Sequence, residues 1–133
     1  MRRAGRVVAI VFLALTSVAG ISNAVNEFGE VDTALQMSVE VGDALWGIFG
    51  LLTAIGMWRR RPWAVTTSVA WAIAVTYTAT VASFAFHDPT FSEQGTQAGA
   101  IATFAATSAI AGLIVWAVRV ASRPADAGQS TPA

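Results

Sequence analysis

Apolar residues along this chain fall into four long runs, which polar and charged segments separate. A helix of roughly 20 residues spans the hydrocarbon core of a bilayer, and each run approaches or reaches that length. Because the connections between runs are short, consecutive helices are expected to lie antiparallel and side by side. The pattern therefore predicts an all-α fold, an antiparallel bundle of four transmembrane helices. The predicted membrane crossings cover residues 7–25, 41–58, 63–86 and 98–118.

Capping patterns place the starts of the second and fourth helices before their apolar runs. Thr33 and Gln36 have the spacing of a capping box. In that motif the side chain of each residue accepts a hydrogen bond from the backbone N–H of the other. Thr90 and Glu93 repeat the pattern, so the fourth helix is expected to begin near Phe91. Both helices are therefore predicted to extend above the outer membrane face.

The first run has two interpretations. Three arginines followed by an apolar stretch and Ser22-Asn23-Ala24 are typical of a cleaved signal peptide. The length of the run equally suits a retained transmembrane helix, which we expect. The four helices would then form one domain over residues 1–122. Residues 123–133 are polar and contain little to bury, which predicts a disordered cytoplasmic tail.

Charge along the chain predicts an orientation. The acidic residues within segments 27–43 and 88–93 alternate along the chain with three arginine clusters. Arginine accumulates on the cytoplasmic side of membrane proteins. The chain is therefore expected to cross the inner membrane of a bacterium with both termini in the cytoplasm. The arginine clusters are Arg2, Arg3 and Arg6, then Arg59, Arg60 and Arg61, then Arg119 and Arg123.

Composition narrows the possible functions. The 133 residues are 55% hydrophobic and only 12% charged, against about 25% charged in soluble domains. Cysteine is absent, which excludes disulfides and thiol chemistry. The arginines flank apolar runs and form no basic surface for nucleic acid. The sequence has no Ser/His/Asp spacing, no glycine-rich phosphate loop and no HExxH motif. We expect no enzyme activity, no cofactor and no metal centre.

The bundle interior is predicted to be apolar. No ionisable residue sits well inside any crossing, which disfavours a proton-coupled transporter or a channel. Trp71, Tyr77 and Phe104 are candidate contacts for an apolar ligand between helices. A buried tyrosine hydroxyl needs a partner, for which Thr107 or Ser108 on the fourth helix is the expectation.

Small residues recur at every fourth position of the fourth helix, where they let helix backbones approach closely. We expect packing within the chain, with a dimer interface as the alternative. The positions are Gly95, Gly99, Thr103 and Thr107.

One polar cluster is expected at the outer face. Asp43 ends the exposed part of the second helix, His87 and Asp88 end the third, and Glu93 begins the fourth. In an antiparallel bundle these four side chains share one membrane height, which suggests a cation site or a partner-docking patch. The alternative is four independently solvated groups.

The stretch Gly42–Val65, GDALWGIFGLLTAIGMWRRRPWAV, resembles the second helix and following turn of DoxX-like proteins. Those are small bacterial four-helix membrane proteins, some linked to quinone-associated redox systems. The resemblance covers about a fifth of the chain and implies the same four-helix membrane architecture.

Three functions stay open at this stage. The first is a structural or accessory subunit, with the lipid bilayer and other membrane subunits or a second copy as partners. The alternative is a protein that binds a lipid, quinone or other apolar ligand within the bundle. The second alternative is a small transporter or channel.

Overall fold

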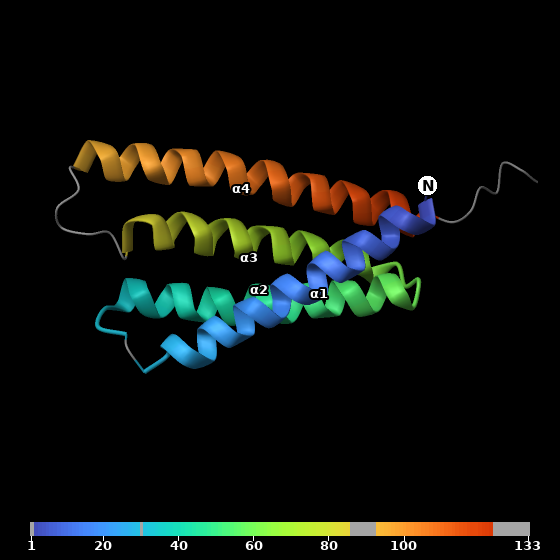
Figure 1. The fold of residues 1–133 in the computed structure, drawn as a ribbon, viewed down its shortest axis with the longest axis horizontal. Coiled ribbons are helices and arrows are strands. Elements are labelled where there is room, and N and C mark those ends of the chain that lie inside the picture. Colours follow the sequence, from blue (N-terminus) through green and yellow to red (C-terminus); the bar gives the residue numbers. More distant parts are fainter. Residues whose placement is uncertain (1, 30, 86–92, 124–133) are drawn as a thin grey trace, which may run out of the picture.

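The computed structural model describes residues 2–29, 31–85 and 93–123, and the described part is helical apart from short turns. The helices are α1 (Arg2–Glu27), α2 (Ala34–Trp58), α3 (Trp63–Ala85) and α4 (Glu93–Ser122). Figure 1 shows α2, α3 and α4 side by side in chain order, while α1 crosses α2 obliquely and reaches α4 near the N-terminus.

Each helix is long and apolar enough to cross a membrane. The qualifying segments are Arg3–Glu27, Ala34–Trp58, Trp63–Ser83 and Gln97–Ser122. The prediction of an all-α fold with four membrane-length helices is therefore confirmed. The direction of the chain across the membrane stays a prediction, and the expected tail, apart from Arg123, lies outside the described residues.

The ends of α2 follow from local chemistry. Thr33 has an extended backbone, and its hydroxyl accepts from the Gln36 N–H at 3.2 Å, as the capping pattern predicted. The Gln36 side chain reaches back one residue further than expected and accepts from the Asp32 N–H at 3.0 Å. At the other end Arg60 adopts a left-handed φ of 55°. That turn lets the Arg61 N–H reach the Gly56 carbonyl at 2.8 Å, which closes the helix before α3 begins.

The apolar core draws two buried residues from every helix. Leu13 of α1, Ala64 of α3 and Val118 of α4 are each 0% exposed. Because Leu13 and Val118 come from the first and last helices, the core ties the ends of the chain together. Its members are Ala9, Leu13, Ala54, Met57, Ala64, Trp71, Ala111 and Val118.

Glycines of α2 allow close approaches between helices. A methyl group built on Gly47 would lie 3.1 Å from the Ser17 carbonyl of α1. One built on Gly50 would meet the Ser17 hydroxyl and lie 3.1 Å from Trp71 Cδ1 of α3. Helices pack at such short range only where a side chain is missing. These glycines therefore set the distances from α2 to both of its neighbours.

Helix α4 is the least covered element. Only 11% of its membrane-length window is buried inside the chain, against 39% for α2. Its contacts are mainly with α3, with fewer to α1 and α2. Large apolar side chains therefore face outward along its length, including Ile101, Ile110, Leu113 and Trp116.

Candidate functional site

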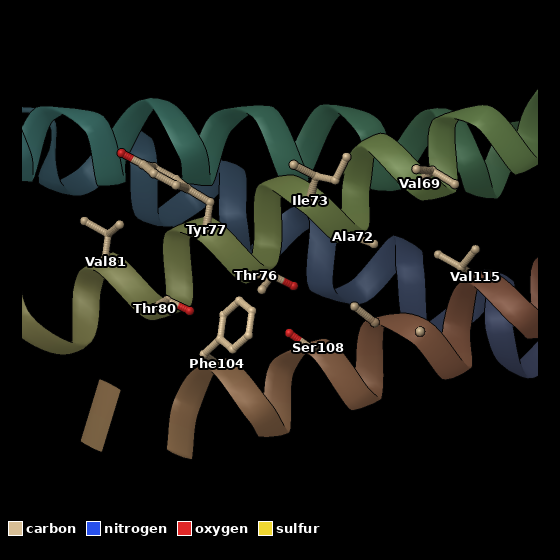
Figure 2. Close-up of a pocket in the computed structure, with 12 residues that line it drawn as sticks. Val69, Ala72, Ile73, Thr76, Tyr77, Thr80, Val81, Phe104, Ser108 and Val115 are labelled. Atoms are coloured by element: carbon tan, nitrogen blue, oxygen red, sulfur yellow. The ribbon is translucent and has the colours of Figure 1, made fainter. Parts of the chain in front are cut away.

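A groove of about 620 Å³ lies between α3 and α4. Apolar side chains of both helices form most of its surface, and four hydroxyl-bearing residues, Thr76, Tyr77, Thr80 and Ser108, also line it. Figure 2 shows these hydroxyls together with the Phe104 ring, which extends from α4 toward α3. The Thr80 Oγ1 atom is buried and has no hydrogen-bond partner. The groove thus combines an apolar surface with a neighbouring buried polar atom that lacks a partner.

Tyr77 lies at the border between this groove and a second one. The second groove has a volume of about 710 Å³ and is formed by α2 and α3. Contrary to expectation, the Tyr77 hydroxyl does not bond to Thr107 or Ser108. It donates to Ser38 Oγ of α2 at 3.0 Å, and the side chain is 47% exposed. The position of Tyr77 on α3 directs the ring toward α2, as Figure 2 shows.

Trp71 does not contact either groove. Its side chain is 2% exposed and packs in the core against Gly50. Its indole Nε1 is buried without a hydrogen-bond partner. Of the three residues predicted to contact a ligand, only Tyr77 and Phe104 line the α3–α4 groove, and Trp71 is a core residue.

The predicted packing stripe of α4 is only partly reproduced. Thr103 and Thr107 are half-buried. Gly99 is exposed, and a methyl group built there would have no neighbouring heavy atom within 4 Å. Within one copy of the chain, Gly99 is therefore not a close-packing position. The surroundings of Gly95 lie outside the described residues.

The predicted outer-face cluster is described only at Asp43. His87, Asp88 and the side chain of Glu93 lie outside the described part of the chain. Asp43 is 8% exposed, and its Oδ1 accepts from Trp46 Nε1 at 2.8 Å. The sequence suggested that Asp43 stands in solvent above the bundle, but its side chain is buried.

Two further carboxylates, which the outer-face prediction omitted, lie near Asp43. Glu40, one turn earlier on α2, is 1% exposed, and both its carboxylate oxygens lack a hydrogen-bond partner. Glu27, at the end of α1, interacts electrostatically with both Glu40 and Asp43. The expectation of an interior without acids is therefore wrong at this end of the bundle. Among the described residues no group of three or more His, Cys, Asp or Glu side chains has metal-binding geometry.

The fold has the form of a multi-pass membrane protein, with four helices long and apolar enough to span a bilayer. No protein-family model matches the chain, and neither a curated protein nor a solved structure shows significant similarity to it. The resemblance of Gly42–Val65 to DoxX-like proteins stays a prediction. The function must therefore be inferred from the grooves, the exposed helix and the buried carboxylates.

Proposed function

We propose that this chain is an integral membrane protein that binds a lipid, a quinone or another largely apolar ligand in the α3–α4 groove. The groove is apolar over most of its surface, which suits an acyl or isoprenoid chain. The ligand also carries a hydroxyl or carbonyl group, because a buried hydroxyl without a partner costs free energy that such a group would recover.

The single observation that carries this proposal is the unpartnered Thr80 hydroxyl beside Phe104 in the groove. Other hydroxyls of α3, such as Ser68 and Ser83, donate to carbonyls of their own helix at 2.6 Å. Thr80 makes no such bond. Its oxygen is buried without a partner in the described chain, and a rotation of the side chain would present it to a molecule held between α3 and α4.

Filling the groove is expected to displace the ligand. We expect Ser108→Phe to reduce the amount of co-purifying lipid or quinone about tenfold, equivalent to roughly 1.4 kcal/mol of binding free energy. Ala109→Phe is the matched control, because Ala109 is exposed and lies outside the groove. The measurement is mass spectrometry of organic extracts from protein purified in mild detergent. Equal ligand content in both variants would contradict the assignment to this groove.

A second function, that of an accessory subunit, is favoured by the exposure of α4. Its outward face carries Ile101 and Leu113, which are 70% and 65% exposed. An apolar face in a membrane is covered either by lipid or by another helix. Native mass spectrometry of the same preparation separates these cases. A second copy or a different membrane protein bound in stoichiometric amount supports the accessory role, and a monomer carrying only lipid opposes it.

We further infer that the chain lies in a bacterial inner membrane with both termini in the cytoplasm. All three arginine clusters lie at one end of the helices (Figure 1). Glu27, Glu40 and Asp43 lie toward the other end. Arginine at one end only is the pattern that retains that end inside.

Cysteine labelling tests this orientation, since the chain has no native cysteine. In intact cells an impermeant maleimide is expected to label Asp32→Cys and not Arg60→Cys. After the membrane is permeabilised, both should react. Labelling of Arg60→Cys in intact cells, with Asp32→Cys protected, would reverse the proposed orientation.

A further inference from the structure

A small, partly polar pocket lies between α1, α2 and α3 at the end of the bundle that carries Glu27. Its volume is about 290 Å³, and its polar lining consists of Asn23 and Glu27 of α1, Asp43 and Trp46 of α2, and Thr78 of α3. It shares no lining residue with the α3–α4 groove. Any activity of this pocket is therefore separate from the ligand binding proposed above.

Thr78 provides an observation independent of the acids. Its side chain is 4% exposed and lines the pocket, and its Oγ1 atom is buried without a hydrogen-bond partner. The hydroxyl lies against Gly42 of α2, where a side chain of any size would collide with it. Gly42 thus leaves room for a hydroxyl that bonds to nothing within the described chain. A buried hydroxyl of this kind points to an absent partner.

The charge balance around the pocket indicates the sign of that partner. Glu27, Glu40 and Asp43 interact with one another. Helix α3 has no charged residue over its whole length. The arginines lie near the start of α1, in the turn after α2 and near the end of α4, which is the opposite end of the helices (Figure 1). Nothing in the described part of the chain neutralises these carboxylates. Glu40 and Asp43 are buried, whereas Glu27 is exposed. A buried carboxylate is stabilised either by taking up a proton or by a positive group, so a cation is one way to satisfy these acids.

We propose that this pocket binds a small organic cation with a primary ammonium or guanidinium group. Asp43 and Glu27 accept hydrogen bonds from the cation, and Thr78 supplies a third oxygen. Glu40 lies outside the pocket lining and interacts electrostatically with Glu27 and Asp43. The volume is at the low end for ligand pockets, which excludes large molecules.

Two observations favour an organic cation over a metal ion. The described acids do not form a metal-binding group of three or more ligands. The indole of Trp46 also lines the pocket, and an aromatic ring attracts a cation that is weakly hydrated. Divalent metals prefer several carboxylate oxygens at short and regular distances. The arrangement of Glu27, Asp43 and Trp46 fits an amine better.

Calorimetric titration of the full-length protein in mild detergent tests the proposal. The probes are ethylammonium and ethylguanidinium, with Na⁺, Mg²⁺ and Ca²⁺ as comparators at constant ionic strength. Both organic cations are expected to bind and to raise the melting temperature. Absence of any binding by either organic probe, or preferential binding of Mg²⁺ or Ca²⁺, would overturn it.

Three substitutions locate the site. Asp43→Asn is expected to weaken binding about tenfold to a hundredfold, the range for loss of one charge-assisted hydrogen bond. The asparagine oxygen can still accept from Trp46, so the fold is retained. Thr78→Val should weaken binding about threefold to tenfold.

Asp32→Asn is the control, because Asp32 is an exposed acid near the start of α2. The affinity of this variant for the organic cations should match that of the wild type. Equal affinity in Asp43→Asn and the wild type would contradict the site. A protein whose stability changes with pH but which binds neither organic cation would also contradict the site.

Discussion

Replacing Gly50 with leucine is expected to lower the free energy of unfolding by about 3 kcal/mol, at the upper end of the usual range for overpacking. The side chain would enter the space between α1 and α3. Its first carbon would meet the Ser17 hydroxyl and lie 3.1 Å from Trp71 Cδ1. Ser17 cannot easily give way, because it is 0% exposed and its hydroxyl donates to the Leu13 carbonyl.

Gly99→Leu is the matched control for that experiment. Gly99 also lies within a helix, but a methyl group there has no neighbour within 4 Å. Leucine favours a helix over glycine by close to 1 kcal/mol at an open position, so stability should stay equal or rise slightly. Thermal denaturation of the monomer in mild detergent measures both effects. A loss of stability at Gly99 as large as that at Gly50 would contradict the observed packing.

The helices themselves could be predicted because their signals are local. Twenty apolar residues, a threonine cap at Thr33 and a proline after Arg61 each act within a few residues of their position. Burial depends instead on which face of each helix meets its neighbours. The sequence pattern along α4 suggested Gly99, but a methyl group there meets no neighbouring atom, whereas Thr103 and Thr107 of the same stripe are half-buried. A stripe of small residues does not say whether it meets another helix of the same chain.

Tyr77 shows the same limit at the scale of one side chain. A tyrosine at mid-helix predicts a hydrogen-bond partner, and the structure supplies one. The sequence could not tell whether that partner was on α2 or α4, since α3 has neighbours on both sides. The bond to Ser38 joins residues 39 positions apart, and no local pattern encodes such a pairing.

Glu40 and Asp43 had a signal in the sequence that simple hydropathy missed. Buried positions of α2 include Gly47, Gly50, Ala54 and Met57, which alternate in steps of three and four residues. Extending the same steps toward the start of the helix gives Asp43 and then Glu40. Helical periodicity therefore predicts these acids on the packed face, while hydropathy alone assigned them to the aqueous side. Their burial is the main reason for inferring a cation site at this end of the bundle.

Leu13→Ala is expected to lower the free energy of unfolding by about 2 kcal/mol, the lower end of the range for a buried leucine. Leu13 is 0% exposed and belongs to the core cluster that all four helices share. Truncation leaves a cavity where α1 meets that cluster, and the lost dispersion contacts are not replaced. The loss is smaller than in water, because apolar surface in a bilayer gains little from leaving lipid.

Leu15→Ala is the control for this substitution. Leu15 lies two residues further along α1 and is 67% exposed, so its side chain contacts lipid or detergent and its truncation should change stability by less than about 0.5 kcal/mol. Thermal denaturation in the same detergent compares the two variants directly. Because both remove the same atoms from the same apolar run, membrane insertion should be affected equally. Any difference in stability then reports the packing of α1 on the bundle, and equal stabilities would show that α1 does not contribute Leu13 to the core.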